Sequence, residues 1–512
     1  MAKPQSRLKR AFYSSLTSGV YQIVAIICGF ISSRLIIGAY GSSWNGVLTS
    51  ITQFLSLFTI LEAGINGSTR VALYQSFANH DLQKTSGIIK ANDIFYRKIS
   101  IFLVFYVGII AVIIPNIVDS NHEKWMIAAM VGIVGLSNFA ENCWGINSKI
   151  LLTASQSRYI INIAETCSKI ANLIVLWIIV RLGGSILAAK SGSSIVLTVV
   201  PIILFVISRR MFRIDRNAEP DNAGLKGRWD VIANSISNIV HQNVDVIFLT
   251  IFCASSEVSV YSLYYLVAGG LTKVFTVVIN GIEAGFGEMW AKGEIENLKN
   301  RLRQFEYIMY SLALLLFGSM IVLVVPFMGI YMRDVTDVNY QRYLLGVLIG
   351  VSEILMSIRT PYVLLVQAAG HYKQVKKAGF IEAGINILLT CILVQIFGIV
   401  GAIIGTIVAN AYRTTMYGLY ASNSMLHRPA RAIVLRVIWL ALSLLIAISL
   451  STIAVNNILI NSWITWIVAA VITFIIHFAI YILGSIIFYK KDLLDSLDLL
   501  PFAFLKKRKR SF

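Results

Sequence analysis

Apolar stretches long enough to cross a lipid bilayer recur along the whole chain, and they constrain its fold more than any other feature. A transmembrane helix needs about 20 mostly apolar residues. Inside the hydrocarbon core, helices and closed barrels are the structures that satisfy their own backbone hydrogen bonds. The sequence therefore predicts an all-α integral membrane protein with about 14 transmembrane helices. We expect these spans at residues 12–38, 44–69, 99–118, 125–148, 160–180, 186–208, 229–252, 258–288, 305–330, 343–368, 378–397, 399–423, 434–455 and 462–488.

The composition agrees with a chain that lies mostly in lipid. Hydrophobic residues make up 57% of the sequence and charged residues 13%, whereas a soluble protein carries about 25% charged residues. The basic residues, which give a formal net charge of +19, form short clusters between the apolar spans and no basic domain. Such clusters suit loops beside anionic lipid headgroups. Membrane lipids are therefore expected partners, and nucleic acid is not.

The distribution of positive charge predicts the orientation in the membrane. Most of the 44 Lys and Arg residues lie in alternate connections between spans, beginning with the N-terminus. Basic residues concentrate in cytoplasmic loops, so we expect both termini to be cytoplasmic. The connections that carry few basic residues are all short, which predicts no sizeable domain on the outer side.

Short related segments indicate an internal repeat. SLTSGVYQ at 15–22 matches SISNIVHQ at 235–242, LEAG at 61–64 matches IEAG at 282–285, and KILLTASQSRY at 149–159 matches YVLLVQAAGHY at 362–372. The matches keep the same order at nearly one offset. Since each half has an even number of spans, the halves should be related by a pseudo-twofold axis along the membrane normal. The expected parts are an N-terminal six-helix lobe (1–208), a cytoplasmic linker (209–228), a C-terminal six-helix lobe (229–425), two additional transmembrane helices (426–490) and a cytoplasmic basic tail (491–512).

We single out twelve of the charged residues inside the expected spans, because a charge at the bilayer centre costs about 2.5–3.5 kcal/mol and has to be explained. They must form ion pairs, lie near an interface or line water. Glu165 and Lys169, four residues apart, favour a local ion pair. The basic members of the set are Arg34, Lys169, Lys273, Arg359 and Arg413, and the acidic members are Glu62, Glu141, Glu165, Asp245, Glu283, Glu353 and Glu382.

Three of the acidic residues, Glu62, Glu283 and Glu382, lie near expected cytoplasmic ends, where they could reach the interface or bind the basic loops. Asp245 follows His241 by one helical turn. That pair is either a counter-charge or proton site, or part of an ion pair between helices.

Basic residues deep within spans are the candidates for substrate binding. Lys273, Arg359 and Arg413 lie well inside their spans, and Lys273 falls opposite Gln53 in the register of the repeat. Either a water-filled cavity or a buried ion pair would explain them. Arg34 and Lys273 have no acidic residue three or four positions away on their own helices. Glu141 and Glu353, which correspond in the repeat, are further candidates for the counter-charge.

Motifs for other chemistry are absent from the sequence. GSILAAKS at 184–191 resembles a phosphate-binding loop but has Ala189 in place of the second glycine, and there is no HExxH motif. The five cysteines are scattered without metal-ligand spacing. We therefore expect no metal, no cofactor and no enzymatic activity.

Several segments together resemble the polysaccharide flippase branch of the multidrug/oligosaccharidyl-lipid/polysaccharide exporter (MOP) superfamily. They are the glycine-bearing LEAGINGSTRVALYQSFANHD at 61–81, NSKILLTASQSRY at 147–159 and RTPYVLLVQAAGHYKQ at 359–374. The last two spans are similar to those of fourteen-span lipid II and spore-cortex flippases. Tyr21 and Gln22 stand where lipid II flippases tend to carry arginine, which argues against lipid II itself as the substrate.

The resemblance implies a flippase in the bacterial cytoplasmic membrane that moves an undecaprenyl-diphosphate-linked oligosaccharide to the outer leaflet for cell-surface polysaccharide synthesis. The implied partners are this lipid-linked oligosaccharide and the polysaccharide polymerase machinery. Members of the superfamily line the cavity between two lobes with cationic residues, and here Lys273 and Arg34 match that placement. A cation-coupled multidrug exporter of the same fold is the main alternative. A polymerase would need a larger outer loop, and a non-transporting scaffold would leave the buried charges without a use.

Overall fold

The computed structural model describes residues 4–79, 81–212, 214–215, 217–222, 242–279 and 283–497. Within these ranges the regular secondary structure is helical, and the one exception is an isolated bridge between Asp119 and Ala254. The chain forms two compact units, Met1–Ser262 and Leu263–Phe512. The expected all-helical fold is confirmed.

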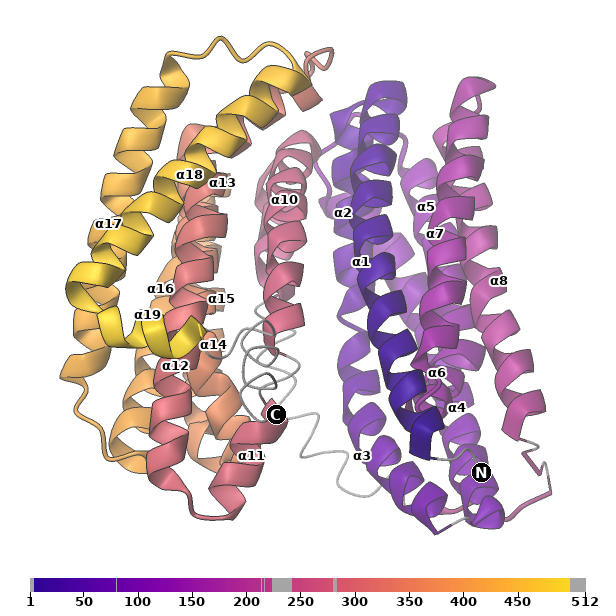
Figure 1. Ribbon diagram of the computed structural model, residues 1–512. Helices are drawn as coiled ribbons and strands as arrows, with labels where there is room; N and C mark the ends of the chain where they lie inside the picture. Colours follow the sequence, from indigo (N-terminus) through magenta and orange to yellow (C-terminus); the bar gives the residue numbers. More distant parts are fainter. Residues whose placement is uncertain are drawn as a thin grey trace. The chain divides into compact units, whose positions relative to one another are not determined.

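The first unit is a bundle of long helices, drawn from indigo to magenta in Figure 1. Its helix α1 packs against α7, and α8 packs against both α5 and α7. The core between them is aliphatic, with Val47, Ile51 and Met130 among its fully buried side chains. The elements are α1 (Pro4–Tyr40), α2 (Ser42–Ser56), α3 (Thr59–Ala78), α4 (Leu82–Ile117), α5 (Lys124–Ala140), η1 (Glu141–Gly145), α6 (Ile146–Ala154), α7 (Arg158–Arg181), α8 (Ile186–Phe212), the unlabelled helix Gln242–Phe252 and the first part of α10 (Ser255–Ile279).

The second unit is also helical, and α16 packs against both α14 and α15. The two additional C-terminal helices, α17 and α18, pack against each other and against α13. The elements after α10 are α11 (Glu283–Ala291), α12 (Ile295–Ala313), η3 (Leu314–Gly318), α13 (Ser319–Tyr331), α14 (Tyr343–Ala368), α15 (Tyr372–Phe397), α16 (Ile399–Leu419), η4 (Tyr420–Met425), α17 (Arg431–Asn456), α18 (Trp463–Phe488) and α19 (Lys490–Leu497).

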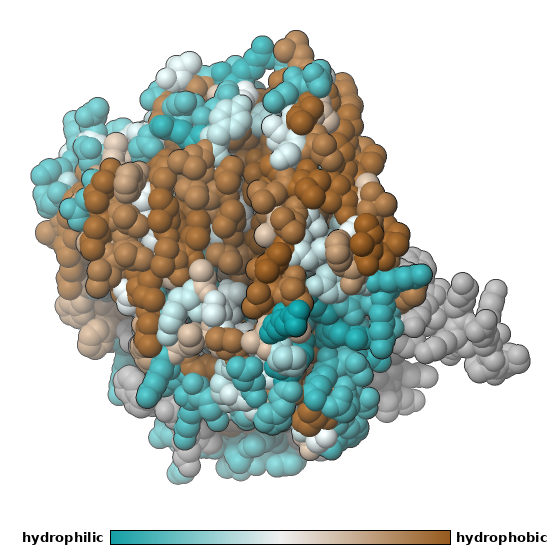
Figure 2. All heavy atoms as spheres, turned by 90° about the vertical axis from the view of Figure 1, so that its left-hand side faces the viewer, coloured by the Kyte–Doolittle hydropathy of each residue, from teal (hydrophilic) through white to brown (hydrophobic). Residues whose placement is uncertain are grey.

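Eleven helices in the described ranges are long and apolar enough to cross a membrane. Figure 2 shows a band of apolar side chains, with hydrophilic zones above and below it, on the face to which α17 and α18 belong. Exposed residues of these two helices include Leu442, Leu445 and Ile467. An apolar band of this kind is what a face in contact with lipid requires. The protein is therefore a multi-pass membrane protein.

The other three of the fourteen expected spans are not observed as single helices that are both long and apolar enough to cross a membrane. The span expected at 44–69 is divided into α2 and α3 by a turn at residues 57–58. The span expected at 229–252 is described from residue 242 as a short apolar helix. Helix α16 has the length of a span and carries Arg413, but it is not among the eleven.

Three helices contain or end in a π-helical turn, which the hydrophobic pattern did not predict. These turns are η1, η3 and η4. A π-turn adds one residue to a helical turn and is frequent at functional sites. The turn η1 begins at Glu141, one of the expected counter-charge residues.

The expected division into lobes stays a prediction. The 209–228 linker lies in part outside the described residues, and the boundary between the two compact units falls inside α10. The basic tail beyond residue 497 also lies outside them.

Candidate functional site

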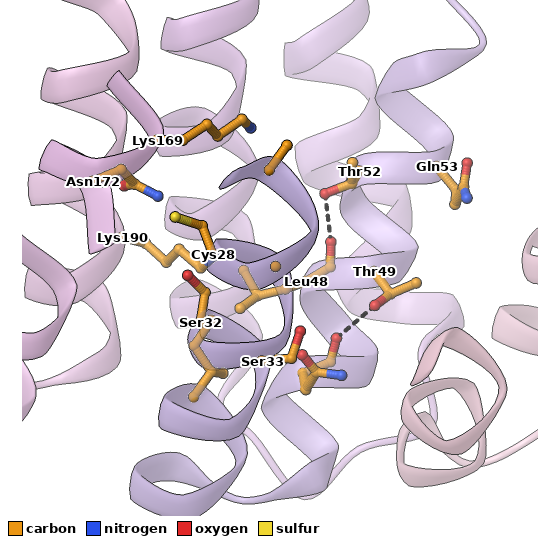
Figure 3. A pocket seen from close by; sticks show the side chains of 14 residues that line it. Cys28, Ser32, Ser33, Leu48, Thr49, Thr52, Gln53, Lys169, Asn172 and Lys190 are labelled. Carbon is orange, nitrogen blue, oxygen red and sulfur yellow. Dashed lines mark hydrogen bonds between the residues drawn. The ribbon is translucent and has the colours of Figure 1, made fainter. Parts of the chain in front are cut away.

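A polar pocket of about 330 Å³ lies within the first unit, between α1, α2, α7 and α8 (Figure 3). Most of the side chains that line this pocket carry a polar group, although the four helices are mainly apolar. They include Cys28, Ser32 and Ser33 of α1, Asn45, Thr49, Thr52 and Gln53 of α2, Lys169 and Asn172 of α7, and Lys190 of α8. Gln53 is thus a predicted site residue that the structure places in a pocket.

Lysines supply the only charge on this pocket lining. Lys169 and Lys190 are both half-buried, and no acidic side chain lines the pocket. Across the part of the chain that the structure describes, neither ammonium group takes part in a hydrogen bond or ion pair. Sequence reasoning missed both residues as site candidates. The available signal was Lys190 itself, a lysine inside a span without an acidic residue three or four positions away.

The α2 wall of the pocket is held in place by hydrogen bonds. Thr49 donates to the carbonyl oxygen of Asn45 at 2.9 Å, and Thr52 donates to that of Leu48 at 2.8 Å. These hydroxyl groups therefore present lone pairs, not protons, to the pocket. The amide of Asn45 donates to the Ser259 hydroxyl at 2.8 Å, which connects α2 to the start of α10.

The expected ion pair between Glu165 and Lys169 does not form. Glu165 instead contacts the Lys149 ammonium group at 2.7 Å, and the same group contacts Glu141 at 2.9 Å. Lys149 lies in α6 and Glu165 in α7. The i,i+4 spacing predicted a contact along one helix, whereas packing brings a lysine from the neighbouring helix to the same carboxylate.

Glu141, which contacts Lys149, is the first residue of the π-turn η1. Its carboxylate lies against Gly145, where a Cβ atom would be 2.6 Å from the carboxylate carbon. The absence of a side chain at Gly145 thus leaves room for this conformation. Glu141 is engaged with Lys149, and it is not among the residues that line the pocket.

Arg359 and Arg413 belong to a buried ion cluster in the second unit. Both are 7% exposed and flank the fully buried Glu382. The Arg413 Nη1 atom lies 2.8 Å from the Glu382 carboxylate and the Arg359 Nη1 atom 3.9 Å from it. Arg359 also donates to Asn410 at 3.3 Å. Of the two explanations open for these arginines, the buried ion pair is the one observed.

Of the three acidic residues expected near the cytoplasmic interface, the structure describes the side chain of Glu382. Glu382 is buried among helices and does not reach an interface, so that expectation is wrong. The side chains of Glu62 and Glu283 lie outside the described residues.

Two other counter-charge candidates, Asp245 and Glu353, are buried and accept hydrogen bonds. Asp245 is 5% exposed and accepts a hydrogen bond of 2.6 Å from Tyr261. Glu353 is 7% exposed and accepts one of 3.1 Å from Thr272. His241 lies outside the described residues.

The two cations proposed for the substrate, Arg34 and Lys273, are each half-buried. Arg34 belongs to α1 in the first unit but does not line the pocket. Lys273 belongs to the part of α10 that lies in the second unit. Their role toward a substrate stays a prediction.

No family model matches the sequence, and no curated protein matches it either. The fold, however, is similar to several solved structures. One is the lipid II flippase MurJ in an inward closed conformation, with a TM-score of 0.72, 14% sequence identity and coverage of 93% of this chain and 99% of that chain. Another is an inward-facing multidrug resistance MATE family transporter of the MOP superfamily, with a TM-score of 0.66, 11% identity and coverage of 82% and 98%. A MOP superfamily transporter from Pyrococcus furiosus is a third, with a TM-score of 0.54, 13% identity and coverage of 81% and 96%.

These three proteins are transporters or flippases and not enzymes, and each matches over nearly its whole length. At such low identity the likeness establishes the fold. The chain is therefore a multi-pass membrane protein with the fold of the MOP superfamily transporters.

Proposed function

We propose that this protein is a flippase that moves an undecaprenyl-diphosphate-linked oligosaccharide from the cytoplasmic to the outer leaflet. It lies in the bacterial cytoplasmic membrane with both termini in the cytoplasm and serves cell-surface polysaccharide synthesis, together with the polymerase machinery. Two lobes would expose the substrate alternately to the two sides of the membrane.

The observation that carries this proposal is the polar, lysine-bearing pocket inside a membrane-spanning bundle. A lipid-linked oligosaccharide has an anionic diphosphate, polar sugars and an apolar tail. The diphosphate needs cationic partners, and the sugars need hydrogen-bonding side chains, whereas the tail can remain in lipid. The likeness to a lipid II flippase over 93% of this chain supports the same substrate class.

The alternative function, export of cationic drugs, has support from the likeness to a multidrug MATE transporter. The charge of the pocket argues against it. Lys169 and Lys190 line the pocket without an acidic residue, so a cationic drug would meet like charge in a site of low dielectric constant. We therefore favour an anionic substrate.

We further propose that Arg34 and Lys273 attract the diphosphate. Loss of one hydrogen bond to a charged group costs about 1.5–3 kcal/mol, so Lys273→Ala and Arg34→Ala should each reduce flipping roughly ten- to a hundredfold. Expression and membrane insertion should be unchanged. If both variants are normally produced and flip substrate at the wild-type rate, this residue assignment is wrong.

Depletion of the gene tests the function itself. The expected result is an accumulation of lipid-linked oligosaccharide in the cytoplasmic leaflet, measured by accessibility of the glycan to an external lectin and by total lipid extraction. If depletion leaves this lipid unchanged and alters only the sensitivity of the cells to cationic drugs, the drug-exporter function is the correct one.

A further inference from the structure

We infer that the pocket between α1, α2, α7 and α8 is a diphosphate subsite, in which Lys169 and Lys190 each bind one of the two phosphoryl groups. This inference rests on the proposed function, because the diphosphate of the lipid-linked oligosaccharide is the group that would occupy the subsite. It adds a second binding site for the diphosphate, separate from Arg34 and Lys273. Neither of those residues lines the pocket.

The charge balance of the pocket favours an anion. Two ammonium groups that are partly removed from water lose solvation, and an uncompensated charge inside a membrane bundle is unfavourable. The pocket lining offers Lys169 and Lys190 no acidic partner. An anionic ligand would restore the balance, and hydroxyl and amide groups such as those of Ser32 and Asn172 can donate to its oxygen atoms.

The contact between Lys149 and Glu165 keeps Lys169 available to such a ligand. Glu165 precedes Lys169 by four residues on α7 and could otherwise pair with it. In the structure Lys149 holds the Glu165 carboxylate at 2.7 Å. The choice of partner by Glu165 therefore determines whether Lys169 brings a net positive charge to the pocket.

The positions of the two lysines fit an elongated anion better than a single phosphate. Helices α7 and α8 are joined by a short turn and pack against each other, with Lys169 midway along α7 and Lys190 one turn into α8. At 1.5 Å per residue their backbones are offset by roughly 12 Å along the bundle. Figure 3 shows the two side chains at different heights of the same pocket. A diphosphate offers one phosphoryl group to each lysine, whereas an orthophosphate offers a single group to both.

The size of the pocket is also consistent with a headgroup. Pockets for drug-sized ligands span about 300–1,000 Å³, and this one, at about 330 Å³, is near the lower limit. A diphosphate with part of one sugar fits such a space. A whole oligosaccharide does not, so the glycan and the polyprenyl tail must lie outside the pocket.

Binding of inorganic diphosphate to the purified full-length protein in detergent tests the subsite. Isothermal titration should give saturable binding of diphosphate, and orthophosphate and sulfate at the same ionic strength should bind at least about tenfold more weakly. Lys169→Ala and Lys190→Ala should each weaken diphosphate binding about ten- to a hundredfold. Lys190→Arg, which retains the positive charge, should keep most of the affinity and serves as the control for folding.

A second set of variants tests the role of Glu165. Lys149→Ala removes the partner of Glu165, so Glu165 should turn to Lys169 and weaken diphosphate binding, although Lys149 does not line the pocket. Lys149→Arg should bind like the wild type. Combining Lys149→Ala with Glu165→Gln should restore binding, because the competing carboxylate is then neutral.

Two results would overturn the subsite. One is the absence of saturable diphosphate binding by the wild type, and the other is unchanged binding in well-folded Lys169→Ala and Lys190→Ala variants. Equal affinity for orthophosphate and diphosphate would refute the two-phosphoryl arrangement. Because the titration does not depend on transport, it separates this failure from a failure of the proposed function, which the depletion experiment reports.

Discussion

His122 and Trp44 form a stacked pair at one end of the first unit, with ring centroids 4.0 Å apart and planes inclined by 15°. His122 lies in the connection between α4 and α5, and Trp44 lies near the start of α2. Burial lowers the pKa of the His122 imidazole below its usual value of 6.5. The folded state therefore favours the neutral ring, whose contact keeps this connection on α2.

We expect this pair to make stability depend on pH. A base with a lowered pKa in the folded state contributes its full stability above its unfolded pKa and loses it as the pH falls. The melting temperature of the detergent-solubilised protein should therefore decrease as the pH falls below 6.5, and His122→Phe should weaken that dependence while keeping a ring on Trp44. An identical pH profile for the variant would show that other groups cause the loss.

The sequence predicted which charged side chains need a partner, but it did not predict which residues are those partners. The sequence identified Glu165, Arg359 and Arg413 as charges that need compensation, and each has a partner in the structure. The partners themselves come from other helices. Spacing along one helix predicts i,i+4 contacts, but it does not report which lysine of a neighbouring helix comes closer.

At the scale of elements, α2 forms one wall of the pocket and is held tightly by its neighbour α10. A Cβ atom at Gly46 would lie 1.6 Å from the carbonyl oxygen of Ser255, so a glycine is needed for this approach. Ser43 and Ser255 share a hydrogen bond of 2.6 Å beside it, and Ser50 shares one of 2.7 Å with Thr250 of the preceding short helix, Gln242–Phe252. Backbone contact and hydrogen bonds together position the α2 side of the site.

Gly46→Ala should disturb this packing. Overpacking a close contact typically costs about 1–3 kcal/mol, and here the obstacle is backbone, which cannot move aside cheaply. We expect a lower melting temperature and weaker diphosphate binding. Gly19→Ala is the matched control, since a Cβ atom at Gly19 of α1 meets nothing within 4 Å. Equal effects of the two substitutions would contradict the close contact.

The short helix α19 is attached to the second unit by an ion network. Asp492 of α19 contacts Arg436 of α17 and lies 3.1 Å from Arg303 of α12. Glu306 of α12 is fully buried and contacts both Arg428 and Arg436. Burial raises the pKa of Asp492, and the arginines oppose this shift. The network joins α12, α17 and α19, so it connects the C-terminal helices to the rest of their unit.

Asp492→Ala should release α19. Removal of one partner from a buried ion pair costs about 3–5 kcal/mol because the other charge is left without compensation. Limited proteolysis near residues 490–497 should become faster, and the melting temperature should fall. Asp495→Ala is the control, since its side chain is 32% exposed and contacts Arg303 alone among the described basic residues. Similar protection of α19 in both variants would mean that its apolar contacts hold it.

Element boundaries were less predictable than element type. Apolar runs located most spans, since length and hydrophobicity are all that a lipid-facing helix requires. The turn between α2 and α3 and the π-turn at Glu141 were not predicted. Just before the first of these turns, the carbonyl oxygen of Phe54 accepts a hydrogen bond from Tyr106 of α4, and in the second Glu141 contacts Lys149. An apolar pattern does not report such contacts.

At the scale of the whole molecule, the sequence repeat predicts two lobes that superpose by a rotation about the membrane normal. Glu141 and Glu353, which correspond in that repeat, have different partners in the structure. Glu141 contacts Lys149, whereas Glu353 accepts a hydrogen bond from Thr272. The polar contacts of the two glutamates therefore differ, and the superposition of the lobes stays a prediction.

The positive charges predict the orientation of the molecule in the membrane, and this prediction can be measured directly. Positively charged loops remain in the cytoplasm, and most of the 44 Lys and Arg residues lie in connections that this rule places inside. In a variant without its five native cysteines, single cysteines at Ser6, Asn217 or Ser511 should resist a membrane-impermeant maleimide in intact cells and react after lysis. A cysteine at Asn461, between α17 and α18, should react in intact cells because the same rule places that connection on the opposite side. The reverse pattern would invert the proposed direction of transport, since the diphosphate would then enter from the other leaflet.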